Sequence, residues 1–109
     1  MIRVDVKRVG ERAEVSITGH AGYALAGYDI VCAGVSSLFY ALANELFCLE
    51  EQQGGCHGVT VENKEGMGKI GAHIRGGSKA EGALEMFLSG IELMAHEYGD
   101  YISISAQTR

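Results

Sequence analysis

The fold is decided by the first segment of the chain, residues 2–18, which reads IRVDVKRVGERAEVSIT. Apolar and polar residues alternate over 2–9 and again over 12–18, the pattern of strands with one buried face. Gly10 and Glu11 interrupt the alternation, so the segment is predicted to be a β-hairpin. A sheet of this kind buries its apolar face under a second layer of secondary structure.

Two later segments have helical spacing. From about Cys32 onward, apolar residues recur every three or four positions, and the pattern stops near residues 54–55. A second helix is predicted to open at Ser78, because Glu81 three residues later completes a capping box, and to close at Gly99. These two helices are the predicted covering layer.

Three more alternating stretches, about 58–63, 68–75 and 101–106, are predicted to be strands. The element order is therefore β-β-α-β-β-α-β. The predicted fold class is α+β, an α/β sandwich-like arrangement in which two helices pack on a mostly antiparallel sheet. A chain of 109 residues has room for one core, so residues 1–109 are expected to form a single domain.

Composition and charge limit the function. The chain is 47% hydrophobic and 21% charged, which excludes a disordered protein. Its net charge is −5 and its nine Lys and Arg residues are scattered along the sequence, so no direct binding of nucleic acid is expected. An acidic surface suits a basic partner, although acidity for solubility alone explains the same charge.

A cytoplasmic location is expected, with no membrane contact. The chain opens in a strand pattern rather than in a signal peptide, and its longest apolar run is far short of the roughly 20 residues of a membrane span. Three cysteines at irregular spacing do not make a disulfide framework, which fits a reducing compartment.

The candidate catalytic residues lie in residues 19–37, GHAGYALAGYDIVCAGVSS. The segment is predicted to run from His20, at the end of a strand, to Cys32, at the start of a helix. The N–H groups and dipole at a helix start favour a thiolate, and the same N–H groups are natural oxyanion donors. A Cys32 nucleophile activated by His20 is thus one interpretation. The other is a small buried cysteine and a histidine that merely ends a strand.

Two further residues of this segment have open roles. Asp29, three residues before Cys32, either orients the imidazole of His20 as the third member of a triad or caps the helix. Ser36, one helical turn after Cys32, either hydrogen-bonds within the site or to substrate, or bonds back to the helix backbone.

A metal site is not predicted. Two residue types that bind zinc occur in the second half of the chain, at Cys48, Cys56, His57 and His73. However, seven residues separate the two cysteines, whereas two to four separate those of typical zinc clusters.

The segment of residues 19–37 resembles the ribosomal-processing cysteine protease family, usually called Prp. The resemblance extends over the whole chain, and the motif that carries it consists of Gly19-His20-Ala21, Gly27, Asp29-Ile30, Cys32-Ala33 and Ser36.

The resemblance implies a cysteine endopeptidase that removes the N-terminal extension of bacterial large-subunit ribosomal protein number twenty-seven, in support of ribosome assembly. It implies that Cys32 is the nucleophile and His20 the general base, with Asp29 and Ser36 at further motif positions. It also implies a homodimer, no metal or cofactor, and a loop between His20 and Cys32 that is mobile until substrate binds.

The loop between the two catalytic positions is apolar in this chain. We expect Tyr23 and Leu25 to help form an apolar pocket for substrate side chains, with Gly22 and Gly27 as further substrate-binding positions. Two other functions fit the residues. One is a non-catalytic ribosome-associated binding module whose glycine-rich loop docks a partner. The other is a redox sensor that uses Cys32, although no resolving cysteine is predicted nearby.

Overall fold

The structure, a computed structural model, describes residues 1–25 and 27–108. Its elements are β1 (Ile2–Val9), β2 (Arg12–Thr18), α1 (Ile30–Glu51), β3 (Cys56–Lys64), β4 (Met67–Ile74), α2 (Lys79–Glu97) and β5 (Ile102–Thr108). The predicted order β-β-α-β-β-α-β is confirmed. The predicted boundaries of β1 and β2 match the observed ones, and those of the other three strands differ by one or two residues.

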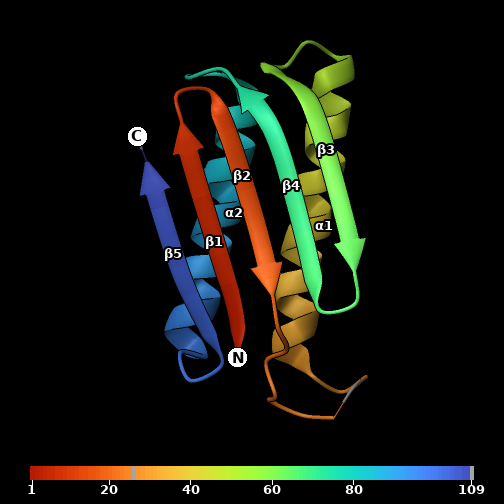
Figure 1. Cartoon of the computed structure of the whole chain (residues 1–109), viewed down its shortest axis with the longest axis vertical. Helices are drawn as coiled ribbons and strands as arrows, with labels where there is room; N and C mark the ends of the chain where they lie inside the picture. Colours follow the sequence, from red (N-terminus) through yellow and green to blue (C-terminus); the bar gives the residue numbers. More distant parts are fainter. Residues whose placement is uncertain (26, 109) are drawn as a thin grey trace.

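The five strands form one mixed sheet in the order β3-β4-β2-β1-β5 (Figure 1). Three neighbouring pairs are antiparallel, and β5 runs parallel to β1. Both hairpin turns contain a glycine with a left-handed backbone, Gly10 at φ +57° and Gly66 at φ +75°. The parallel pair exists because α2 carries the chain back along the sheet before β5 begins. The prediction of a mostly antiparallel sheet is confirmed.

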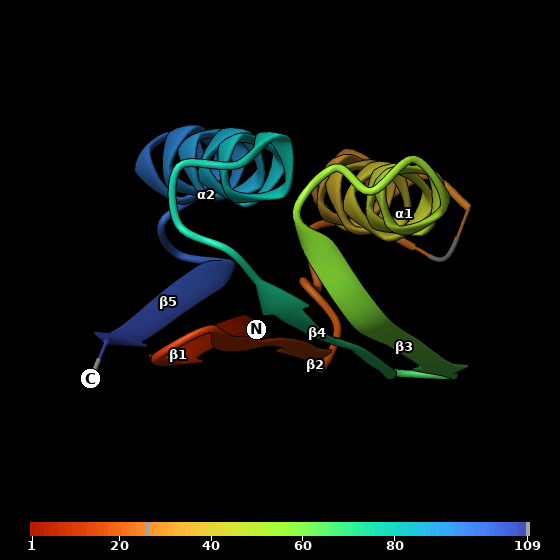
Figure 2. The same cartoon turned by 90° about the horizontal axis from the view of Figure 1, so that it is seen from above.

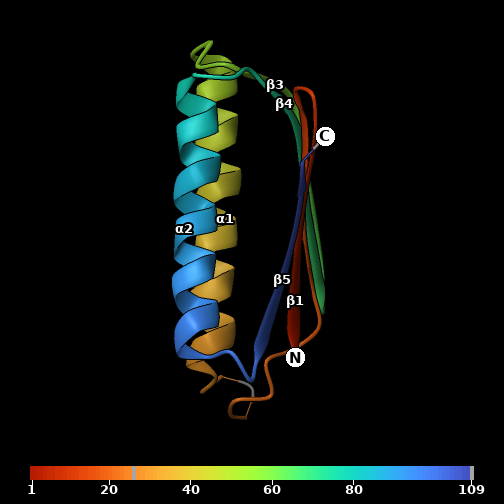
Figure 3. The ribbon, with the colours of Figure 1, turned by 90° about the vertical axis from the view of Figure 1, so that its left-hand side faces the viewer.

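The molecule has two layers, with both helices on one face of the sheet (Figures 2 and 3). The core lies between the layers and draws alternate residues from the strands, including Val4, Val15 and Ile70. The opposite face of the sheet is uncovered and polar. There Lys69 of β4 lies 3.4 Å from the Glu14 carboxylate of β2. This division reproduces the alternation of the sequence.

The helix α1 is apolar enough, by length and composition alone, to cross a membrane, with a mean hydropathy of 1.5 over an 18-residue window. Here its apolar residues pack in the core, where the buried positions are Val31, Val35, Phe39, Leu42, Ala43, Leu46 and Leu49. Because they recur every three or four residues, one face of the helix lies on the sheet and on α2.

The two helix starts are set by side-chain caps. The Ser78 hydroxyl accepts a hydrogen bond from the N–H of Glu81 at 3.3 Å, as the predicted capping box requires. The carboxylate of Glu81 reaches the N–H of Gly77 at 3.0 Å, one residue before the cap. The helix α1 begins at Ile30, two residues earlier than predicted, because Asp29 is its N-cap.

One end of the sheet brings the segments of interest together. The end of β2, the β3–β4 turn and the start of α1 all lie at the lower end of Figure 1, together with the end of α2 and the start of β5. A hydrogen bond of 2.9 Å from the N–H of Gly19 to the carbonyl of Gly66 joins the first two of these segments.

Candidate active site

Cys32 lies in the first turn of α1, and Asp29 fixes where that helix begins. Asp29 Oδ1 accepts hydrogen bonds from the backbone N–H groups of Val31 and Cys32, each at 3.0 Å. Asp is a preferred N-cap because its carboxylate satisfies N–H groups that have no partner within the helix. The cap holds the half-buried thiol of Cys32 at the helix end that faces the end of β2.

His20 follows β2 after a tight turn at Gly19. Gly19 has a φ of +89°, and a Cβ atom at this position would lie 2.4 Å from the carbonyl oxygen of Met1, so only glycine fits. The ring of His20 lies over the β3–β4 turn, because its Nε2 atom is 3.4 Å from the position of a Cβ at Gly66. The imidazole is thus held at the same end of the sheet as the thiol.

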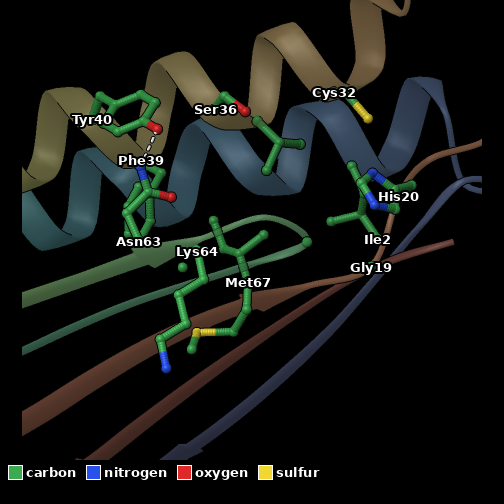
Figure 4. A pocket seen from close by; sticks show the side chains of 14 residues that line it. Ile2, Gly19, His20, Cys32, Ser36, Phe39, Tyr40, Asn63, Lys64 and Met67 are labelled. Atoms are coloured by element: carbon green, nitrogen blue, oxygen red, sulfur yellow. Dashed lines mark hydrogen bonds between the residues drawn. The ribbon is translucent and has the colours of Figure 1, made fainter. Parts of the chain in front are cut away.

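Cys32 and His20 line one cavity of about 180 Å³ between α1 and the sheet (Figure 4). Figure 4 shows the sulfur of Cys32 and the ring of His20 at one end of this cavity and Tyr40 at the other. Apolar side chains make much of the wall, among them Ile2, Ile17, Val35, Phe39 and Met67. Within residues 1–25 and 27–108, no hydrogen bond joins the imidazole to the thiol.

A second cavity, of about 470 Å³, begins at the same two side chains. It lies under the loop before α1, and its lining includes Gly22, Gly27 and Asp29. His20 and Cys32 line both cavities. A chain that occupied both cavities would therefore pass directly over the sulfur.

Three of the N–H groups at the start of α1, which were expected to hold an oxyanion, already have hydrogen-bond partners at this helix end. Those of Val31 and Cys32 donate to the Asp29 side chain. That of Ala33 donates to the Asp29 backbone carbonyl at 3.0 Å. The N–H group that faces the sulfur belongs instead to Ala21, whose nitrogen is 3.4 Å from Cys32 Sγ. The donor beside the sulfur thus comes from the loop after β2.

The carboxylate of Asp29 ties this loop to the helix. While Oδ1 caps α1, Oδ2 accepts hydrogen bonds from the N–H groups of Tyr23 at 3.1 Å and Ala24 at 3.4 Å. The N–H of Cys32 is the largest cause that lowers the pKa of Asp29, and the two loop N–H groups lower it further. Of the two roles that the sequence left open, these contacts favour the cap.

Ser36 and Tyr40 continue the line of Cys32 along α1, one and two helical turns further on. Ser36 lines both cavities. The hydroxyl of Tyr40 and the side-chain amide of Asn63 are hydrogen-bonded at the far end of the first cavity (Figure 4). This pair was not predicted from the sequence, although the spacing of four residues from Ser36 was a signal for Tyr40. Nothing local in the sequence pointed to Asn63.

The loop positions expected to bind substrate separate into two groups. Gly22 and Gly27 line the second cavity with His20 and Cys32. Tyr23 instead packs against the rings of Tyr98 and Tyr101, in the turn between α2 and β5, and Leu25 is 81% exposed. The two side chains that were expected to share an apolar pocket therefore lie apart from both cavities.

The other cysteines lie away from this site. Cys56 is buried with 7% of its surface exposed, and its thiol donates to the carbonyl of Leu46 at 3.3 Å. Burial raises the pKa of the Cys56 thiol, and the nearby Glu50 raises it further. His57 and His73 stack at 4.7 Å between ring centres. In the part of the chain that the structure describes, no three His, Cys, Asp or Glu side chains are grouped as metal ligands.

Replacing Gly19 with alanine is expected to lower both stability and activity. The Cβ atom would meet the Met1 carbonyl at 2.4 Å in a left-handed backbone, so the turn must move and carry His20 with it. We expect the free energy of unfolding to fall by about 1–3 kcal/mol. The kcat/KM of Gly19→Ala should also be lower than that of Gly10→Ala. Gly10 is the matched control because its φ is also positive, but its Cβ has open space. The two variants are compared by thermal unfolding and by peptide cleavage. Equal effects in both would contradict this account of Gly19.

Substitutions at Asp29 separate its two possible roles. If it caps α1 and anchors the loop, Asp29→Asn keeps much of kcat/KM, whereas Asp29→Ala loses both Tm and kcat/KM. A drop of about 10⁴ in kcat for Asp29→Asn with an unchanged Tm would instead assign it to orienting His20.

Because the folded-state pKa of Asp29 is lowered, its stabilising contribution is complete above about pH 5 and is lost as the pH falls below about 4. The difference in Tm between wild type and Asp29→Asn should therefore shrink in that acidic range.

Comparisons with known proteins agree on one family. The family model for cysteine protease Prp matches residues 1–103. Ribosomal processing cysteine protease Prp from two strains of Staphylococcus aureus is 26% identical to this chain over 107 residues, which is 96% of this chain and 98% of the relative.

Two solved structures have the same fold. The S. aureus protease Prp with a covalently linked product peptide superposes with a TM-score of 0.83 at 24% identity, covering 97% of this chain and 99% of that one. SMU.848 from Streptococcus mutans has a TM-score of 0.71 at 28% identity, covering 100% and 96%.

Proposed function

The chain belongs to the cysteine protease Prp family, and from this we propose that it removes the N-terminal extension of large-subunit ribosomal protein number twenty-seven. In this proposal residues 1–109 act as one cysteine protease domain in the cytoplasm and support ribosome assembly. The observation that carries it is the position of His20 and Cys32, which are twelve residues apart in sequence and line the same two cavities. The S. aureus relatives are ribosomal processing proteases.

The proposed reaction is acyl transfer through a thioester. His20 takes the proton of the Cys32 thiol, and the sulfur attacks the carbonyl carbon of the scissile bond. The N–H of Ala21, already directed at the sulfur, is the nearest donor for the negative charge that develops on the carbonyl oxygen. The C–N bond then breaks as His20 returns the proton to the leaving amine. His20 then takes a proton from water, which attacks the thioester carbonyl. The C–S bond breaks, the acid is released, and the proton on His20 returns to the Cys32 sulfur. Side chains and backbone N–H groups perform every step.

The two cavities suggest how the peptide lies. The first, of about 180 Å³, has apolar walls and ends at Tyr40 and Asn63, which suits one apolar side chain of moderate size. The second lies under Gly22 and Gly27, where the absence of side chains gives peptide backbone room to approach. Ser36 lies between the two cavities and is placed to bond to the peptide. Leu25 lines neither cavity, but its exposed side chain remains a candidate contact of the loop.

A homodimer belongs to the proposal through the family resemblance, and size-exclusion chromatography with light scattering tests it. No nucleic acid and no membrane are expected to take part. The peptide extension is the proposed partner, and a basic tail on the substrate suits the net charge of −5.

Cleavage of a defined peptide tests the proposed function. The substrate is a synthetic peptide that carries the N-terminal extension of the organism's own ribosomal protein number twenty-seven, joined to the first residues of the mature protein. Liquid chromatography with mass spectrometry is expected to show one cut at the boundary, with a scrambled peptide left intact. An intact extension peptide after prolonged incubation with folded protein would remove the proposed substrate and favour the non-catalytic binding module.

A further inference from the structure

Tyr23 is held at both its ring and its backbone, although it lies in the loop between His20 and Cys32. Its ring packs edge-to-face on Tyr98, with ring centres 5.6 Å apart and planes at 88°. It packs in the same manner on Tyr101, at 5.2 Å and 73°. Its backbone N–H donates to Asp29 Oδ2 at 3.1 Å. These contacts fix one residue of the loop to the body of the protein on two sides.

The surface that receives the ring is itself firmly held. Tyr98 is the C-cap of α2, and its N–H donates to the carbonyl of Met94 at 2.8 Å. The N–H of Tyr101 donates to the carbonyl of Tyr98 at 2.9 Å, and the carbonyl of Tyr101 accepts from Ile2 of β1 at 2.8 Å. The two tyrosines are half-buried against the core. The turn between α2 and β5 is therefore a fixed platform for the loop.

The residues just before Tyr23 include Ala21, which contacts the Cys32 sulfur. Ala21, two residues earlier, is 4% exposed and donates its N–H to Cys32 Sγ. His20 is one residue further back. Gly22, between Ala21 and Tyr23, has a φ of +70°, so the chain turns sharply from the sulfur to the aromatic platform. The position of Tyr23 thus limits where the Ala21 N–H can lie.

We propose that Tyr23 is a positioning residue, which holds the loop on Tyr98 and Tyr101 so that the Ala21 N–H and the imidazole of His20 face the Cys32 sulfur. This inference rests on the proposed function, in which Cys32 is the nucleophile. Each edge-to-face aromatic pair changes an equilibrium constant by about 2- to 10-fold. The loss of both pairs therefore releases the loop for a substantial fraction of the time. Tyr23 does not touch the reacting atoms in this account.

The test compares Tyr23→Ala and Tyr23→Phe with Tyr28→Ala, a change of the same residue type in the same loop. Tyr28 is 79% exposed, which makes it the matched control. Without any substrate, we expect iodoacetamide to alkylate Cys32 about tenfold more slowly in Tyr23→Ala. Tyr23→Phe, which keeps the ring, and Tyr28→Ala should stay within about twofold of wild type. Hydrogen exchange measured by mass spectrometry should show faster exchange at residues 21–24 in Tyr23→Ala alone.

Steady-state cleavage adds the second readout. A positioning role lowers kcat with little change in KM, whereas a direct substrate contact raises KM and leaves alkylation without substrate unchanged. The second pattern would overturn the inference and restore Tyr23 to a substrate pocket. Tyr101→Ala, which removes one of the two pairs, should show part of the alkylation loss of Tyr23→Ala, and the double variant should lose no more than Tyr23→Ala alone. Additive losses would likewise overturn the inference.

The outcome is separable from that of the proposed function. If wild type fails to cut the extension peptide while Tyr23→Ala still loosens residues 21–24 and slows alkylation, the aromatic contact stands and the proposed substrate falls. If wild type cuts the peptide and Tyr23→Ala changes neither exchange nor alkylation, the proposed function stands and the positioning role falls. Circular dichroism of each variant confirms that the comparison is made on folded protein.

Discussion

Cys32→Ala is expected to abolish peptide cleavage, with kcat/KM reduced by about 10⁴-fold or more. Among the described side chains that line both cavities, Cys32 carries the thiol, which is a better nucleophile than the Ser36 hydroxyl and forms the acyl intermediate in the proposed reaction. Cys32→Ser tests the chemistry more strictly, because it keeps the size and the hydrogen-bonding capacity of the side chain. A hydroxyl is much less readily deprotonated than a thiol, so we expect the serine variant to be almost as inactive as the alanine variant.

The matched control for Cys32 is Cys48→Ala. Cys48 is half-buried on the same helix, about four turns beyond Cys32, and lines neither cavity. This variant should keep the kcat/KM of wild type, and all three variants should keep the helical signal in circular dichroism. Cleavage by Cys32→Ala at more than about 1% of the wild-type rate would assign the nucleophile to another residue.

His20→Ala is expected to lower kcat/KM by about 10²- to 10⁴-fold, the usual contribution of a general acid–base. The same imidazole accepts the thiol proton and returns it to the leaving amine, so its loss affects both halves of the reaction. The pH dependence of kcat/KM should flatten in the variant, because the proton-exchanging group is gone. Iodoacetamide labelling of Cys32 at mildly acidic pH should slow in parallel.

The control for His20 is His57→Ala, which removes an imidazole from the uncovered face of the sheet. It should leave kcat/KM and the pH profile unchanged. If His20→Ala keeps the wild-type pH profile, then another group exchanges the protons and the assignment of His20 is wrong. If both histidine variants lose activity equally, the effect comes from stability and not from catalysis.

Most of the fold was predictable because it depends on patterns that repeat. The alternation over residues 2–18 predicted the hairpin and its buried face, and the Ser78 capping box predicted where α2 begins. The start of α1 was misplaced by two residues because Asp29 had two plausible roles. Strand order was not predicted, since the parallel pairing of β1 with β5 depends on the path of α2 and not on any local pattern.

The site was predictable in its residue types but not in its contacts. The motif from Gly19 to Ser36 pointed to Cys32 and His20, which the structure places on the same two cavities. The role of the Ala21 N–H was not predictable, because a backbone group leaves no mark in the residue sequence. Tyr23 looked like a substrate contact since it lies in an apolar loop. Its partners Tyr98 and Tyr101 are more than seventy residues away in sequence.

The central claim is that His20 activates Cys32 toward a peptide carbonyl held over both cavities. A peptide that carries the extension and ends in a chloromethyl ketone at the scissile position tests this claim most directly. Such a peptide alkylates a thiolate only when it is bound with its ketone at the sulfur. Peptide mapping by mass spectrometry after treatment with less than one equivalent should show one adduct, on Cys32, which is absent with a scrambled peptide and greatly slowed in His20→Ala. An adduct on Cys48 or Cys56, or equal labelling by the scrambled peptide, would contradict the account.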